Sequence, residues 1–106
     1  MAKVKLEIIG FQNAIKKMSI GQEQLDRAIA LAKSYGATRL ILFGSAAIKP
    51  EEAGDLDLAC DGVAGWEFYE LGARLEEELE IPLDLISLNP PTRFTRLIER
   101  KGKVLV

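Results

Sequence analysis

Residues 54–60 of this 106-residue chain read GDLDLAC, in which two acidic residues alternate with apolar ones. Successive side chains of a β-strand point to opposite faces, so Asp55 and Asp57 share one face while the leucines and Cys60 share the other. Carboxylates on a half-buried sheet face are unfavourable unless a positive group is held beside them. The pattern predicts a strand that packs on one face and binds metal on the other.

Two further apolar runs extend this pattern. Residues 81–88 read IPLDLISL, with Asp84 as the only charge, so a neighbouring strand would add a third carboxylate. Residues 38–43 read TRLILF, a buried strand, and Gly44 and Ser45 turn out of it into a loop. A glycine lets backbone approach a ligand closely, and N–H groups with a serine hydroxyl can cradle a phosphate.

Each feature alone has an ordinary explanation. A Gly-Ser pair after a strand is a common turn, an Asp-Leu-Asp run is often an exposed edge strand, and a single carboxylate can sit at a strand end. Their order and spacing are more specific, because nine residues separate Ser45 from Asp55. Together the features favour a site for phosphate and metal.

With an apolar strand ending in Gly-Ser and a later Asp-apolar-Asp strand, the chain resembles the nucleotidyltransferase superfamily of DNA polymerase β and kanamycin nucleotidyltransferase. Within it, the chain is most similar to the minimal nucleotidyltransferases of bacteria and archaea. Residues 96–106 also resemble the helix, glycine and short strand that close those domains. The resemblance implies a minimal nucleotidyltransferase domain over residues 19–106, with residues 1–18 as an N-terminal extension.

By this resemblance, Gly44 and Ser45 hold the triphosphate of a nucleotide such as ATP. Asp55, Asp57 and Asp84 ligate two Mg²⁺ ions, and Asp84 also helps to deprotonate the attacking hydroxyl. Oxygen ligands suit Mg²⁺, and paired ions can stabilise the entering and leaving oxygens of an in-line displacement.

One position departs from that family. Its members usually read Gly-Ser-x-Ala-Arg-Gly, whereas residues 44–49 read GSAAIK, which places Ile48 where arginine is usual. Arginine binds phosphate oxygens through a planar fork, and isoleucine offers no polar group. Lys49 is the candidate to replace it in nucleotide binding, and weak or lost turnover is the alternative. Glu51 and Glu52 would repel a triphosphate, so they are expected to face solvent.

Composition limits the remaining classes. With 48% hydrophobic content the chain is expected to form one domain. It has no run of about 18 apolar residues and no signal-peptide pattern, which predicts a cytoplasmic protein without membrane contact. A net charge of −2 argues against general DNA binding. The absence of histidine excludes catalytic nucleophiles that depend on histidine and metal sites built from histidine. Cys60, the only cysteine, is expected to be a small buried hydrophobe.

Periodicity predicts the order helix, strand, strand, helix, strand, helix. The first helix is expected to follow a capping box that begins at Ser19, and to stop at Gly36. The second helix spans residues 66–80. The third helix follows an Asn89 cap and has Pro91 in its first turn. This order predicts an α/β (α+β) domain, a polymerase β-like core with a small mixed sheet, helices packed on one face and the aspartates on the other. Core packing is expected for the apolar helix residues Leu25, Ala28, Ile29, Ala32, Phe68, Leu71, Leu75, Leu79, Phe94, Leu97 and Ile98, and for Trp66 and Tyr69.

Charged stretches and the N-terminus are less specific. Residues 1–18 fit an added edge strand with a short helix, or an apolar arm that pairs with another copy in a homo-oligomer. Residues 76–78, all glutamate, fit a solvated helix face or a surface for a basic partner. Solvent exposure is expected first, a partner surface second and nucleotide phosphate third, for Arg93, Arg96, Arg100, Lys101 and Lys103.

A domain this small has little surface left to bind an acceptor substrate. A second protein is therefore expected to supply part of the site or to be the acceptor. The resemblance implies a helical HEPN-domain partner, commonly a ribonuclease toxin, with the nucleotidyltransferase as its antitoxin. The leading hypothesis is transfer of a nucleoside monophosphate, AMP from ATP, to a hydroxyl of that partner.

Two alternatives stay open. One is nucleotidyl transfer to a small hydroxylated molecule or an RNA end. The other is a binding module that has lost catalysis and neutralises its partner by contact, for which Ile48 is the main argument.

Overall fold

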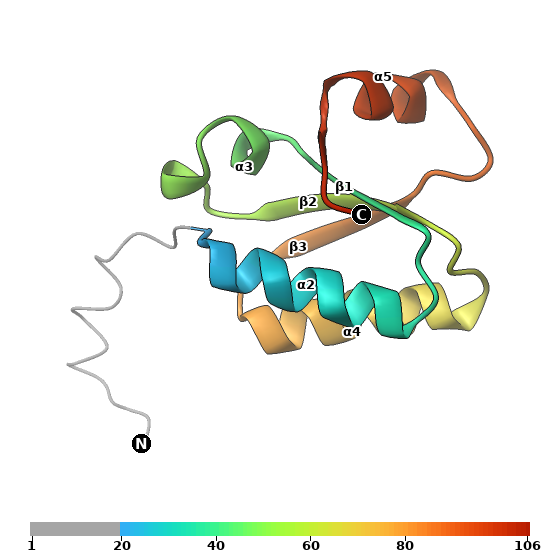
Figure 1. Cartoon of the computed structure of the whole chain (residues 1–106), viewed down its shortest axis with the longest axis horizontal. Coiled ribbons are helices and arrows are strands. Elements are labelled where there is room, and N and C mark those ends of the chain that lie inside the picture. Colours follow the sequence, from blue (N-terminus) through green and yellow to red (C-terminus); the bar gives the residue numbers. More distant parts are fainter. Residues whose placement is uncertain (1–19) are drawn as a thin grey trace.

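The structure, a computed structural model, describes residues 20–106. The elements run in the order α2 (Gln22–Ser34), β1 (Arg39–Phe43), α3 (Ser45–Ile48), the 3₁₀ turn η1 (Pro50–Glu52), β2 (Leu56–Asp61), α4 (Trp66–Leu79), β3 (Leu83–Ser87), α5 (Arg93–Lys101) and β4 (Lys103–Val104) (Figure 1). The expected order of helices and strands is confirmed, and so is the short strand after the last helix. The extension of residues 1–18 and the capping residue Ser19 lie outside the described residues.

The four strands form one mixed sheet in the order β3-β2-β1-β4. Strand β1 pairs antiparallel with β2 and with β4, while β2 pairs parallel with β3. The parallel pair depends on α4, which carries the chain back between β2 and β3. The mixed sheet and the α+β class are therefore as the sequence predicts.

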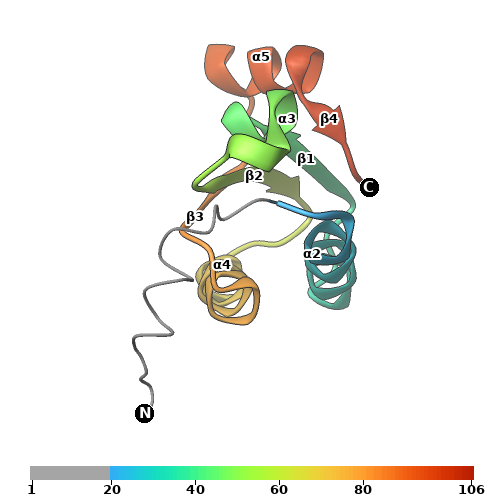
Figure 2. The same cartoon turned by 90° about the vertical axis from the view of Figure 1, so that its left-hand side faces the viewer.

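The larger apolar core lies between the sheet and helices α2 and α4, which cover the same face (Figure 2). Leu56, Leu58 and Cys60 of β2 point into this core, as the alternation in the sequence predicts. Each fully buried leucine stabilises the fold by about 2 kcal/mol. This face is thus committed to packing.

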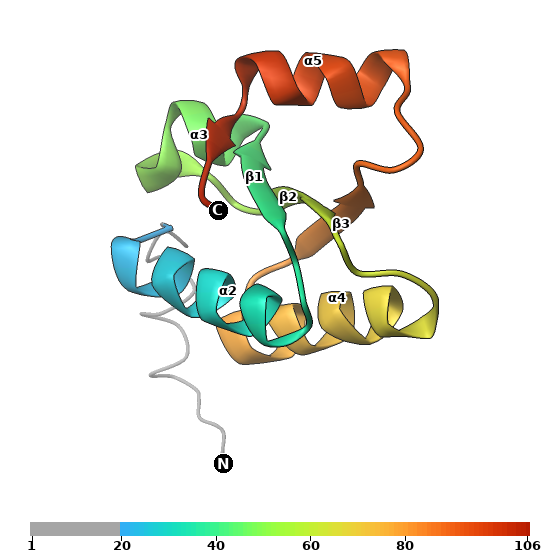
Figure 3. The ribbon, with the colours of Figure 1, turned by 45° about the vertical axis from the view of Figure 1, so that its right-hand side comes forward.

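Helix α5 lies over the opposite face of the sheet (Figures 2 and 3). A smaller cluster forms there from Ile41, Ala59, Leu88 and Ile98. The expectation of helices on one face holds for α2 and α4 but is wrong for α5, which packs on the other face through Ile98. The chain can follow α5 directly with β4 because Gly102 has no side chain, since a Cβ there would meet the Ile98 carbonyl oxygen at 2.7 Å.

Four aromatic and aliphatic residues that were expected in the core are largely exposed. Phe94 and Leu97 are 50% and 43% exposed, because α5 rests on the sheet through Thr95 and Ile98. Trp66 and Tyr69 are 71% and 76% exposed, since α4 is buried along Leu71, Leu75 and Leu79 and these two fall outside that stripe. Within residues 20–106, no helix is long and apolar enough to cross a membrane.

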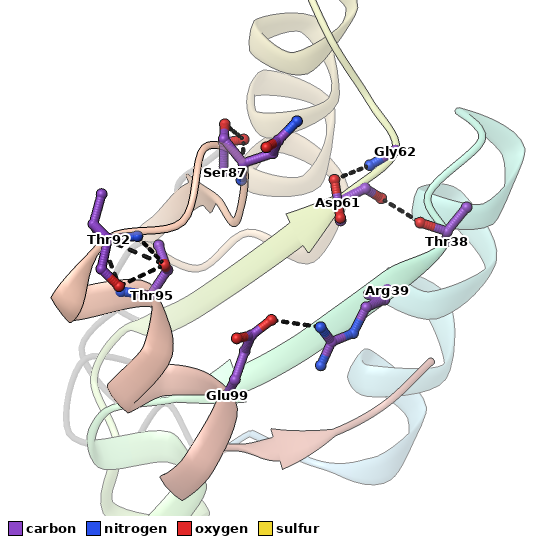
Figure 4. Close-up of polar contacts among 9 residues, drawn as sticks. Thr38, Arg39, Asp61, Gly62, Ser87, Thr92, Thr95 and Glu99 are labelled. Atoms are coloured by element: carbon purple, nitrogen blue, oxygen red, sulfur yellow. Dashed lines mark hydrogen bonds and ion pairs between the residues drawn. The ribbon is translucent and has the colours of Figure 1, made fainter.

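Two helix caps also differ from expectation. Helix α2 begins after Gly21, whose N–H donates to Oε1 of Gln24 at 2.8 Å. Helix α5 begins after Thr92 rather than Asn89, so Pro91 lies outside it. Thr92 Oγ1 accepts from the Thr95 N–H at 3.1 Å, and Thr95 Oγ1 accepts from the Thr92 N–H at 2.7 Å (Figure 4). These reciprocal bonds satisfy N–H groups of the first turn, which is what a cap requires.

Candidate functional site

Asp57 and Asp84 lie side by side on neighbouring strands. In the parallel pairing of β2 with β3, Asp57 is the register partner of Asp84. Both belong to the sheet face opposite α2 and α4, because their neighbours Leu56, Leu58 and Leu85 pack into the larger core. The sequence expectation that Asp84 joins the aspartates of the earlier strand depended on the strands being neighbours, and they are.

Asp55 precedes β2 and is exposed, as is Asp84, whereas Asp57 between them is half-buried. The pKa of Asp57 is raised, chiefly by burial and further by the charges of Asp55 and Asp84. Burial and like charges both disfavour a carboxylate, so this position is electrostatically unfavourable without a positive group. A cation beside Asp57 would relieve both effects.

Gly44 brings the turn after β1 against Asp57. It has φ +75°, a conformation that side-chain-bearing residues rarely adopt. A Cβ at this position would collide with Oδ2 of Asp57 and would lie 3.2 Å from its Cγ. The backbone of the turn therefore contacts the carboxylate directly, so the Gly-Ser turn and the acidic strand make one site.

The loop that was expected to run from Ser45 to residue 54 contains α3 and η1. Ser45, the first residue of α3, is exposed. Ile48 ends α3 with its side chain 79% exposed, and Lys49 follows with Nζ 4.0 Å from Oε2 of Glu52. Glu51 and Glu52 are exposed, as predicted.

The aspartates suit a divalent cation by the chemistry of their donor atoms. They offer only hard oxygen donors, from one face of the sheet, around a carboxylate whose pKa is raised by burial and then by the charges of its neighbours. In residues 20–106, however, no group of three or more Asp, Glu, Cys or His side chains already has the geometry of a metal site. Metal ligation by Asp55, Asp57 and Asp84 accordingly stays a prediction, and it requires side-chain rotation.

The sequence did not predict an apolar groove that lies beside the candidate site. An apolar groove of about 200 Å³ lies between α3 and α5 and is lined by Phe43, Gly44, Ala47, Ile48, Phe94, Leu97, Ile98, Lys101 and Gly102. A helix as short as α5 needs only one narrow stripe to rest on a sheet. Positions 94, 97 and 98 follow the i, i+3, i+4 spacing of such a stripe, so the sequence carried no separate signal that Phe94 and Leu97 would line a groove.

Several solved structures resemble this one. A chain of the Shewanella oneidensis complex of a tri-AMPylated HEPN toxin with an MNT antitoxin superposes with a TM-score of 0.65, at 22% identity, over 80% of this chain and 71% of that one. A chain of a toxin-antitoxin structure with AMP-PNP gives 0.66 at 21% identity, over 77% and 72%. A structure described as a minimal nucleotidyltransferase gives 0.62 at 27% identity, over 76% and 88%.

The chain folds as the minimal nucleotidyltransferases do. No family model and no curated protein matches the sequence, so the likeness is one of structure. It covers about three quarters of this chain or more. The family that the Gly-Ser and Asp-Leu-Asp motifs suggest is thus the one whose fold the chain has.

Proposed function

We propose that this chain is a metal-dependent nucleotidyltransferase that moves AMP from ATP to a hydroxyl of a HEPN-type partner protein, and so acts as its antitoxin. The observation that carries the proposal is the register pair Asp57 and Asp84 beside the glycine turn at Gly44. A half-buried carboxylate with acidic neighbours has no packing role on this face. It is well placed to hold cations beside a phosphate.

The solved structures support the reaction and the partner. One holds a HEPN toxin that carries AMP groups together with an MNT antitoxin, and another holds AMP-PNP. These facts belong to those proteins, at 22% and 21% identity. They make a HEPN-type protein the first acceptor to test for this chain.

In the proposed reaction the acceptor oxygen forms a bond to the α-phosphorus of ATP, and the bond from that phosphorus to the bridging oxygen of the β-phosphate breaks. Pyrophosphate leaves, and the hydroxyl proton passes to Asp84, which is exposed on the edge strand β3. Mg²⁺ bound to the aspartates supplies charge neutralisation for the phosphates. Asp55 and Asp57 would hold the ion, while backbone N–H groups of the turn and the Ser45 hydroxyl can donate hydrogen bonds to the phosphate oxygens.

Nucleotide affinity depends on what replaces the usual arginine. Ile48 cannot bind phosphate, and we assign the neighbouring Lys49 as the point charge that does. Its present contact with Glu52 is long, at 4.0 Å, and both side chains are more than half exposed. Such an exposed pair is worth little and can exchange for a phosphate.

The test is mass spectrometry of both proteins after incubation of the chain with Mg²⁺, ATP and a HEPN-domain partner protein. The proposal expects the partner to gain AMP with the wild-type chain and to remain unmodified with Asp57→Asn or Asp84→Asn. Lys33→Ala, at an exposed site on α2, is the control that keeps transfer. A partner that stays unmodified in the presence of folded wild-type chain, Mg²⁺ and ATP would contradict the proposal.

A second candidate, inhibition by contact alone, is favoured by Ile48, which is 79% exposed in the position of the usual arginine. Inhibition that persists without ATP, and in Asp57→Asn, would establish it. Release of pyrophosphate with an unmodified partner would instead point to a small-molecule or RNA acceptor.

A further inference from the structure

Exposed apolar side chains gather on one side of the molecule around the groove between α3 and α5. Ile48 is 79% exposed, Phe94 50% and Leu97 43%. These three come from two separate elements and line the same groove of about 200 Å³. Single exposed apolar residues are ordinary, but a hollow patch built from distant parts of a chain is typical of an interaction surface.

The groove has a basic rim. Lys101 lines it directly. Arg93 and Arg100 stand at i−4 and i+3 from Leu97 on α5, so they lie beside Leu97 on the helix surface, and both are exposed. None of the residues that line the groove is acidic. Glu99, the one acid of α5, is paired with Arg39 (Figure 4).

The groove adjoins the candidate catalytic residues. Phe43 lines it and is the register partner of Asp57 across β1 and β2. Phe43 also meets Phe94 edge to face, with ring centroids 5.9 Å apart. Gly44, which contacts the Asp57 carboxylate, lines the groove as well. Anything held in the groove therefore lies next to the acidic strand.

We infer that this groove is the docking surface for the acceptor protein, and that it takes a segment of that protein in which apolar side chains are flanked by acidic ones. The inference rests on the proposed function and adds where the acceptor binds. It also gives Ile48 a role, since an apolar side chain in place of the usual arginine enlarges the docking surface while Lys49 is left to serve the nucleotide.

A protein segment fits the surface better than a second copy of this chain. Aromatic residues and arginines beside an apolar centre are the composition of protein interface hot spots. The longest acidic run of the described residues, 76–78, lies on α4 across the sheet from the groove. A contact between that run and the basic rim of a second copy would join two different faces and would not close into a dimer. The complementary acidic face is therefore assigned to a different protein.

The experiment measures, by calorimetry, the affinity of matched neutral variants of the chain for the HEPN-domain partner protein of the proposed reaction. Ile48→Ser and Leu97→Ser remove apolar contact without adding charge. Trp66→Ser removes an equally exposed apolar residue, 71% exposed, at the start of α4. We expect the first two to weaken the complex about tenfold or more and the third to leave it unchanged. All three should bind Mg²⁺-ATP like the wild type and keep their thermal unfolding midpoint.

The basic rim is tested in the same assay. Arg100→Glu should weaken the complex and reduce its salt dependence, whereas Lys33→Glu on α2 should do neither. Equal effects of the two charge reversals would contradict an acidic partner segment.

Other results would overturn the inference in distinguishable ways. Unchanged affinity in both serine variants would remove the groove from the interface even if AMP transfer occurs. Loss of ATP binding in Leu97→Ser would assign the groove to the nucleotide, and sedimentation of the chain alone as an oligomer that Ile48→Ser dissociates would assign it to a second copy. A weakened complex without any AMP transfer by the wild type would keep the docking surface and reject the proposed function.

Discussion

Gly44 and Asp57 meet at the centre of the candidate site, and each constrains the other. The turn can lie against the carboxylate only because residue 44 has no side chain and tolerates φ +75°. Asp57 is in turn held half-buried between acidic neighbours. Burial and the charges of Asp55 and Asp84 both disfavour the ionised carboxylate, an environment that a bound cation would stabilise.

Substitution of Gly44 by alanine should reveal this constraint. We expect Gly44→Ala to lower the free energy of unfolding by about 1–3 kcal/mol, because the new Cβ must enter a strained conformation and displace Asp57. Gly54→Ala is the matched control, since nothing lies within 4 Å of a Cβ there, and it should change stability by less than about 0.5 kcal/mol. Urea denaturation of both variants decides the point, and equal losses would show that Gly44 is an ordinary turn residue.

Cys60 gives a prediction about pH. Burial, and then the charge of Asp61, raise the pKa of this thiol to about 11. In the unfolded chain its pKa is about 8.5, so its stabilising contribution is complete below that pH and is lost as pH rises toward 11. Between pH 8.5 and 10.5 the wild type should lose about 1–2 kcal/mol more stability than Cys60→Ala. Parallel curves for the two proteins, measured by denaturation across this range, would contradict a buried neutral thiol.

At the residue scale, sequence identified the acidic cluster but not its apolar neighbour. Alternation alone places Asp57 opposite the packing face, and Asp84 is conspicuous as a lone charge in its strand. The exposure of Phe94 and Leu97 was not predictable in this way. It depends on how far α5 is rolled on the sheet, and that is set by contacts with residues distant in sequence.

Helix α5 lines one side of the groove beside the candidate site. It is short, with only Thr95 and Ile98 fully buried, and its start is fixed by the reciprocal bonds of Thr92 and Thr95. The ion pair of Glu99 with Arg39 joins its later part to β1. A helix with so small a buried stripe depends on its cap for position.

Loss of the Thr92 cap should destabilise the start of α5. Thr92→Ala is expected to lower the free energy of unfolding by about 1 kcal/mol, because the Thr95 N–H loses its acceptor. Asn89→Ala, at the residue whose sequence position suggests a cap, should change it by less than about 0.5 kcal/mol. Hydrogen exchange should show faster exchange at the start of α5 in Thr92→Ala only. A larger loss of unfolding free energy in Asn89→Ala than in Thr92→Ala would instead identify Asn89 as the cap.

Elements with strong periodicity were predictable, and short ones were not. The stripe at Leu71, Leu75 and Leu79 defines α4 from sequence, and β-alternation defines β2. Helix α3 spans four residues, too few for a periodic signal, and it forms because the turn at Gly44 starts it and the loop must return to β2. The same lack of signal hid the Thr92 cap, since Asn89 and Thr92 are both good capping residues.

The molecule as a whole divides its two sheet faces between the larger core and the candidate site. Helices α2 and α4 bury one face, while the other carries the aspartates and only one short helix (Figure 3). Charge follows the same division, with acidic residues along α4 and basic residues along α5. Sequence predicted the mixed sheet and the separation of the two faces, but not that α5 would cross to the face of the candidate site.

The central claim is that this second face, with its carboxylates and glycine turn, binds a metal-nucleotide complex. Calorimetry of ATP binding in the presence and absence of Mg²⁺, on the wild type and on Asp57→Asn, tests it most directly. We predict that the wild type binds ATP with Mg²⁺ and at least about tenfold more weakly without it, and that Asp57→Asn loses the Mg²⁺-dependent gain. ATP affinity that is the same with and without Mg²⁺, or that is unaltered in Asp57→Asn, would contradict the claim.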